Sequence, residues 1–266
     1  MTTPPAPCVP NPSGLSALRD AAGFYSQLSG VLAGFAFAGL VALIAARIGA
    51  RSSYGDLAVA YRPTVSAFVC LVAASMSFAL AAGDPTSLGR ASSLETAAGL
   101  GFAAAVLTLL YSLLVLLHAV ERDVPDETGQ TRSAFSLLQR AFVILVCPLT
   151  VLVFSAGMHD HIRLRTGTTT GLQGLDVASL AAVGAVLVVG LLARRFATRM
   201  RERRPAAPDR LPALAMAMAL VAVGVSTVVV IAADPCRPSP DLLPATELAL
   251  VAIFAAAAAV TAARLD

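Results

Sequence analysis

The sequence predicts an all-α integral membrane protein, a polytopic bundle of seven transmembrane helices, and three observations support this fold class. Hydrophobic residues fill 57% of the 266 positions and charged residues only 13%, about half the share of a soluble domain. The mean hydropathy is +0.78. Apolar runs of about 20 residues, the length that an α-helix needs to cross a bilayer, recur along the chain.

Seven of these runs are predicted to be transmembrane helices, because lipid offers the backbone no hydrogen-bond partners. Their approximate bounds are 24–46, 64–82, 97–119, 141–157, 175–193, 211–233 and 243–263. The fourth run is the shortest and contains Pro148, which indicates a kink. Residues 1–23 are expected to form a Pro-rich tail outside the cytoplasm with the start of an interfacial helix, and residues 24–266 the transmembrane domain.

The basic residues predict the orientation of the chain. All 19 are arginine, and most of them fall in loops on one side of the predicted bundle. Since cationic loops stay in the cytoplasm, we expect the N-terminus outside and the C-terminus inside. The heavy use of alanine and arginine indicates a GC-rich bacterial genome, and hence the plasma membrane of a bacterium.

The densest group of arginines follows the fifth run, where the helix is expected to continue beyond the bilayer until Pro205 ends it. We expect these side chains to contact anionic lipid headgroups on the cytoplasmic side. They are Arg194, Arg195, Arg199, Arg201, Arg203 and Arg204. No aromatic platform accompanies them, so nucleic acid is not expected as a partner.

The residues required for several kinds of chemistry are missing from the sequence. Without lysine, the chain cannot form a Schiff base with retinal or pyridoxal phosphate. His159 and His161 are expected in an outer loop, and two ligands are too few for a typical zinc site. There is no HExxH motif and no serine beside a membrane-embedded histidine. We therefore predict no enzyme, no cofactor and no metal.

Four polar residues lie near the predicted outer ends of the spans: Gln27, Glu95, Asp176 and Glu247. Ionisable groups in membrane spans are functional candidates. Glu247 follows Pro244 in the expected first turn of the seventh span, where the helix dipole favours a carboxylate. One interpretation is therefore a helix cap, and the other is an acidic outer mouth built from all four residues.

The four cysteines divide by their position in the sequence. Cys70 and Cys147 lie within spans, where a thiol behaves as a small apolar side chain. Cys8 and Cys236 both fall on the predicted outer side, where disulfides are permitted. We expect these two to form a disulfide, and the alternative is two unpaired thiols.

An internal repeat is indicated by similar span boundaries. The second run opens on YRP and is followed by AAGDP, while the sixth opens on DRLP and is followed by AADP. Two parallel units, 24–119 and 175–263, would then be joined by the helix at 141–157. This plan resembles the three-plus-one-plus-three topology of the sugar-transporting SWEET proteins, without their sequence motifs. The alternative is a common turn signal recurring in an Ala-rich chain.

The first span carries a small residue at every fourth position. These positions are Ala22, Ser26, Gly30, Gly34, Ala38, Ala42 and Ala46. Small residues let helices approach closely in lipid, where packing drives association. The row is interpreted as a packing ridge for another helix of this chain or for a second copy.

Together these features favour a non-enzymatic membrane protein that acts through helix contacts, as a scaffold or as a subunit of a membrane complex. Its expected partners are the lipid bilayer and either a second copy of the chain or other membrane subunits. The alternative function is a small-solute transporter or channel with an acidic outer mouth.

Overall fold

The structure is a computed structural model that describes residues 12–49, 57–83, 88–123, 130–166, 172–200, 210–232 and 242–265. Within these ranges every regular element is helical and no strand occurs. The helices are α1 (Pro12–Gly49), α2 (Leu57–Gly83), α3 (Leu88–Asp123), α4 (Gln130–Ala141), α5 (Cys147–Thr166), α6 (Leu172–Met200), α7 (Leu211–Ala232) and α8 (Leu242–Ala262). A π-helical turn, η1 (Phe142–Val146), joins α4 to α5, so the described part contains seven helical rods.

Six of the seven rods are long and apolar enough to cross a membrane. Their candidate spans are Ser16–Ala45, Ala60–Gly83, Ser93–Ala119, Ser133–His159, Leu175–Phe196 and Ala245–Ala262. The seventh rod, α7, contains a shorter apolar segment, Leu211–Val225. Each segment coincides with one predicted run, which confirms the all-α polytopic class. The chain is a multi-pass membrane protein by the length and composition of its helices.

The first helix starts earlier than the apolar pattern alone suggests. α1 begins at Pro12, and proline is favoured in the first turn of a helix because its missing N–H is not needed there. Residues 12–23 of the predicted tail are therefore helical, while residues 1–11 lie outside the described residues. The starts of α1, α3, α6 and α8 share one end of the bundle, which we call the predicted outer end.

The fourth rod is irregular at the predicted position. Pro148 has no N–H, and its ring would collide with the carbonyl group four residues earlier in a regular α-helix. The turn immediately before it widens to π geometry, in which the Cys147 N–H donates to the Phe142 carbonyl oxygen. A π-turn of this kind is one of the known ways in which a helix accommodates such a break.

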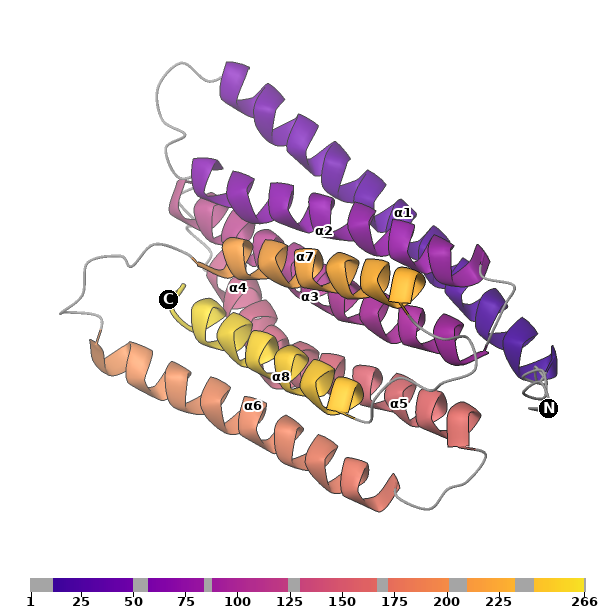
Figure 1. The fold of residues 1–266 in the computed structure, drawn as a ribbon. Helices are drawn as coiled ribbons and strands as arrows, with labels where there is room; N and C mark the ends of the chain where they lie inside the picture. Colours follow the sequence, from indigo (N-terminus) through magenta and orange to yellow (C-terminus); the bar gives the residue numbers. More distant parts are fainter. Residues whose placement is uncertain are drawn as a thin grey trace, which may run out of the picture.

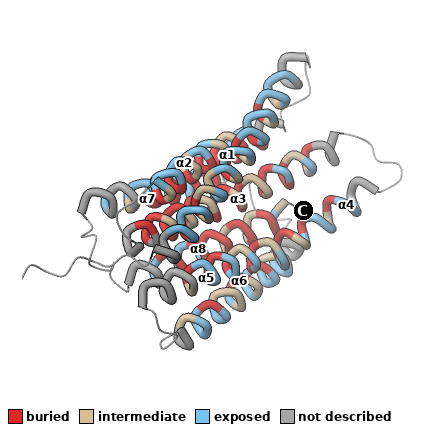
Figure 2. The backbone as a smooth tube through the Cα atoms, turned by 90° about the vertical axis from the view of Figure 1, so that its right-hand side faces the viewer, coloured by how far each residue is buried: buried red, intermediate tan, exposed pale blue. Residues whose placement is uncertain are grey.

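The central helix of the bundle is α3, which contacts α1, α2, α5, α7 and α8. In the apolar stretch of its candidate span, 61% of the residues are buried, against 22% in α1 and 17% in α6. Those two helices therefore lie at the edges (Figure 1), and Figure 2 shows mostly exposed positions along both. α1, α2 and α7 lie on one side of α3, while α5 and α8 lie on the other side and α6 packs on those two.

The pairing of helices does not repeat between the two halves of the chain. α1 packs along α2 and α2 along α3, whereas α6 packs on α8 and α5. α7 packs mainly on α2 and α3, and it makes only a minor contact with α8, one of the two helices with which it would form the second unit. The predicted duplication of 24–119 and 175–263 therefore receives no support from the helix pairing.

Small residues allow the closest helix contacts. At Gly190 of α6, an added Cβ would lie 2.7 Å from Val143 Cγ1 of η1 and 3.4 Å from Ala259 Cβ of α8. At Gly101 of α3, it would lie 3.4 Å from Ala222 Cβ of α7. These glycines let neighbouring backbones approach to a distance that a larger side chain would prevent.

Candidate functional site

The row of small residues on α1 serves two different surfaces. Ala22 is fully buried, and Ser26 Oγ donates to the Ser75 carbonyl oxygen of α2 at 3.0 Å. Ser75 Oγ donates back to the Ser26 carbonyl oxygen at 2.9 Å. Gly30 is exposed, yet its Cβ position lies 3.7 Å from Ser75 Oγ. The first part of the row therefore lies along α2.

The second part of the row turns away from the bundle. A Cβ at Gly34 would meet nothing within 4 Å, and Ala38 and Ala42 are exposed. The side chain of Ala46 lies outside the described residues. Because an α-helix turns by about 100° per residue, each step of four advances by about 40°, so the row winds around the helix.

The seam that holds α1 on α2 instead follows alternating steps of four and three residues. Its members are buried or half-buried: Ala22, Ser26, Ser29, Ala33, Ala36, Leu40 and Leu43. This spacing averages 3.5 residues, which keeps a seam in contact as two helices wind around each other. We call these seven residues the inner seam.

A second line with the same spacing runs along the exposed side of α1. Its members are Gln27, Val31, Gly34, Ala38, Val41 and Ala45, all of them exposed. We call these six residues the outer seam. It combines one amide, three small residues and two β-branched residues, with exposed fractions of 57% at Val31 and 50% at Val41.

The four polar residues predicted to form an outer mouth are separated in the structure. Gln27 is exposed on the outer seam, and Glu95 is half-buried on α3. Asp176 lies on α6, where its side chain is 58% exposed. Glu247 is buried on α8 with 4% exposure. α1 and α6 lie at opposite edges of the bundle, so Gln27 and Asp176 do not share one opening (Figure 1).

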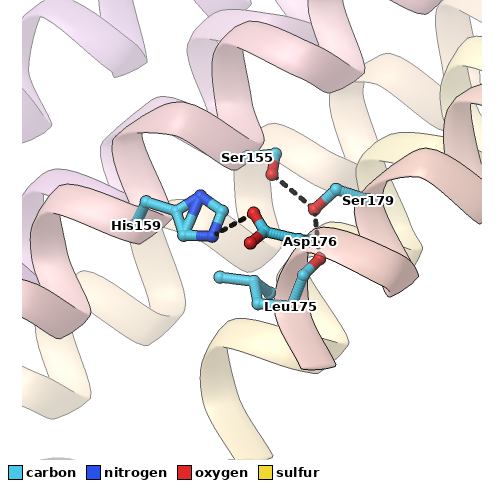
Figure 3. Close-up of polar contacts among 5 residues, drawn as sticks. All are labelled: Ser155, His159, Leu175, Asp176 and Ser179. Carbon is cyan, nitrogen blue, oxygen red and sulfur yellow. Dashed lines mark hydrogen bonds and ion pairs between the residues drawn. The ribbon is translucent and has the colours of Figure 1, made fainter. Parts of the chain in front are cut away.

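A polar cluster joins α5 to α6 near the predicted outer end (Figure 3). His159 Nε2 lies 2.9 Å from Asp176 Oδ1, without the alignment of a hydrogen bond. One turn away, the Ser155 and Ser179 hydroxyls are hydrogen-bonded, and Ser179 Oγ is also 2.7 Å from the Leu175 carbonyl oxygen. Since Asp176 is largely exposed, its pairing with His159 contributes at most about 1 kcal/mol.

The loop predicted to hold His159 and His161 is helical instead. α5 continues to Thr166, so both histidines are helical residues and that prediction was wrong. Ser155 and Ser179, which are 3% and 4% exposed, were not predicted from the sequence as site residues. The available signal was a serine in each of two apolar spans, because a hydroxyl in lipid requires a partner.

Another missed polar residue fixes the other end of the bundle. Gln139 of α4 is 1% exposed, and its Nε2 donates to the Ala262 carbonyl oxygen at the end of α8 at 2.9 Å. The same carbonyl oxygen also accepts the Leu265 N–H at 3.2 Å, so Gln139 adds a second hydrogen bond at the end of this helix. Gln139 therefore ties the fourth rod to the end of α8.

The other predicted site residues are described only in part. Cys70 and Cys147 are buried and free, as expected, while Cys8 and Cys236 lie outside the described residues. α6 continues to Met200, which confirms the predicted helical extension as far as the structure describes it. Arg194 is half-buried and Arg195 exposed. The side chain of Arg199 and all of Arg201, Arg203 and Arg204 lie outside the described part.

The interior between α2, α3 and α7 contains a small depression lined by alanine, glycine, serine and valine. It has no room for a water molecule, and none of the four predicted mouth residues lines it. Among the described residues, no three His, Cys, Asp or Glu side chains come together as a metal site would require. Comparison of the chain with protein-family models, with curated proteins and with solved structures finds no match.

Proposed function

We propose that this chain acts through helix contacts inside the membrane, as a scaffold or as a subunit of a membrane complex, and that it catalyses no reaction. The observation that carries the proposal is the outer seam of α1. Gly34 lies in the middle of a candidate span, and a Cβ added to it would meet only open space. A close-packing residue at this place has no packing role within the part of the chain that the structure describes.

A physical argument favours a partner at this seam. Glycine in the interior of an exposed helix is about 1 kcal/mol less favourable than alanine, and lipid gains nothing from its small size. A second helix gains from it, because small residues four apart allow backbones to approach closely in lipid. Gly34 and Ala38 have this spacing.

The amide of Gln27 adds a polar contribution to the same face. It lies on the outer seam seven residues before Gly34, within the first candidate span. An amide between two transmembrane helices stabilises their association by about 0.6–2 kcal/mol. Because symmetric homo-oligomers are the commonest assemblies of a single chain, a second copy is the partner that we propose first.

Cysteine cross-linking in membranes tests this proposal. Gly34→Cys and Ala38→Cys are made in a chain that also carries Cys8→Ser and Cys236→Ser. A disulfide requires Cα atoms closer than about 7 Å, so we expect oxidation to yield covalent dimers in both variants. The matched control is Val188→Cys on the other edge helix, α6, because the Val188 side chain is 55% exposed.

The control defines the result that would contradict the proposal. Random collisions in the bilayer would cross-link Val188→Cys as readily as the two α1 variants. Equal yields at all three positions, or monomers at all three, would exclude α1 as the contact helix.

We also propose that the N-terminus faces outside and that the arginines at the end of α6 contact anionic headgroups. The distribution of arginines in the sequence supports both statements. Each arginine near the surface contributes about 1 kcal/mol to such binding. The plasma membrane of a bacterium is the membrane that we propose.

Small-solute transport is the second candidate, and one observation favours it. Glu247 is a buried acid inside a candidate span, and such groups often mark the path of an ion or substrate. A solute pathway requires water near this carboxylate. A thiol-reactive aqueous probe that modifies Ser93→Cys from the outer side would support this candidate, and complete protection would count against it.

A further inference from the structure

Glu247 occupies an environment that the proposed helix contacts do not explain. It is 4% exposed on α8, within the candidate span Ala245–Ala262. Because α8 begins at Leu242, Glu247 is the sixth residue of the helix, and the first turn contains no acidic residue. The prediction that placed it in the first turn was therefore wrong.

No hydrogen bond satisfies this carboxyl group within the described part of the chain. Both Oε1 and Oε2 of Glu247 are buried without a hydrogen-bond partner there. The Thr96 hydroxyl of α3 lies beside the carboxyl group. That hydroxyl also donates to the Ser93 carbonyl oxygen at 3.1 Å.

Among the described side chains around Glu247, no basic group is available to compensate a carboxylate. The helices packed against α8 are α3, α5, α6, α7 and η1. Among their described side chains near the predicted outer end, the titratable groups are Glu95, His159 and Asp176. His159 already lies against Asp176, and two of the three are acids. α7 and η1 contribute no titratable group.

A buried carboxylate without a hydrogen-bond partner is strongly unfavourable unless a positive charge accompanies it. We propose that the Glu247 carboxyl group and the Thr96 hydroxyl bind one small monovalent cation, a proton or a sodium ion, between α8 and α3. A proton requires a single carboxylate oxygen. A sodium ion is a hard cation that binds oxygen ligands, of which the site offers two from Glu247 and one from Thr96.

This site is separate from the outer seam, which lies on a helix that does not pack against α8. A cation at Glu247 and a partner on α1 can therefore be tested independently. Ala245 and Thr246 are exposed directly before Glu247, so the site lies close to the predicted outer end. That position gives a small cation a short path to the aqueous phase.

Labelling with a hydrophobic carbodiimide tests the proposal in the full-length protein in sodium-free buffer. The reagent takes the carboxyl proton on one nitrogen while the carboxylate oxygen bonds to its central carbon. The adduct rearranges to a stable N-acylurea, which mass spectrometry detects as a gain of one reagent mass. We expect this gain on the peptide that contains Glu247, and its loss in Glu247→Gln.

Sodium addition distinguishes the two cations. If sodium binds, replacing choline chloride by sodium chloride lowers the labelling and raises Tm, because a ligand of the native state stabilises it. If the site takes only a proton, sodium changes neither quantity while labelling persists. Both outcomes support a small-cation site, and Glu247→Gln should remove the sodium-dependent Tm shift.

Asp176→Asn provides the matched control, since it removes an exposed acid from the same end of the bundle. It should leave the labelling of Glu247 unchanged. The proposal is overturned if Glu247 remains unlabelled in sodium-free buffer at every pH at which the chain is folded and sodium leaves Tm unchanged. Labelling that persists in Glu247→Gln at the same peptide would overturn it as well.

Discussion

Gly190→Leu is expected to destabilise the bundle more than any other single substitution considered for this chain. Even the first carbon of a side chain at this position would lie 2.7 Å from Val143 Cγ1 and 3.4 Å from Ala259 Cβ. Overpacking of this kind costs about 1–3 kcal/mol for small additions, and leucine adds three more carbons. Thermal unfolding in detergent should show a large loss of Tm, with a smaller loss for Gly190→Ala.

Gly184→Leu is the control on the same helix. A Cβ at Gly184 meets nothing within 4 Å, so leucine there would face open space. We expect a Tm within a few degrees of the parent. If Gly190→Leu and Gly184→Leu unfold at the same temperature, then α6 does not pack against η1 and α8 as described.

Gly34→Leu is expected to abolish self-association and to leave the fold intact. The substitution places a large side chain on the outer seam, yet no described part of the chain lies within 4 Å of the added Cβ. Energy transfer between labelled copies in lipid vesicles should fall, with an apparent dissociation constant at least about tenfold higher, which corresponds to about 1.4 kcal/mol. The free energy of unfolding should change by no more than about 0.5 kcal/mol.

Ala36→Leu is expected to give the opposite pattern. Ala36 is 2% exposed on the inner seam, where a larger side chain forces α1 away from the bundle. Stability should fall by about 1–3 kcal/mol. If Gly34→Leu also lowers stability to this extent, the outer seam is an internal packing surface and the distinction between the two seams is incorrect.

The sequence was sufficient to predict the helices because lipid leaves the backbone few alternatives. The seven apolar runs in the sequence correspond to the seven helical rods, and Pro148 correctly predicted which rod is irregular. The end of α5 was missed because residues 158–166 are polar. A helix that projects beyond the apolar region no longer needs an apolar sequence, so hydropathy cannot indicate where such a helix ends.

Pairing between helices was harder to predict, because it depends on which faces meet. The every-fourth row on α1 is continuous in sequence, but its turn of about 40° per step places Gly34 about 120° around the helix from Ala22. α7 occurs next to α6 in the chain and packs instead on α2 and α3. Similar turn motifs at the ends of spans contain no information about such lateral placement.

The sequence predicted several residues of the candidate sites, but it did not predict which of them lie together in the structure. Glu247 was recognised from its sequence position, but its burial against Thr96 depends on the contact between α8 and α3. Asp176 was recognised too, while its partner His159 was assigned to a loop. The hydrogen bond between Ser155 and Ser179 depends on the contact between α5 and α6, which the sequence does not indicate.

The most direct test of the central claim is the native mass of the unmodified chain in a mild detergent or in lipid nanodiscs. The outer seam predicts an assembly of at least two copies, which Gly34→Leu converts to a monomer with an unchanged Tm. A parent protein that stays monomeric across the accessible concentration range, or a Gly34→Leu variant with the same mass as the parent assembly, would contradict the claim that α1 joins two copies.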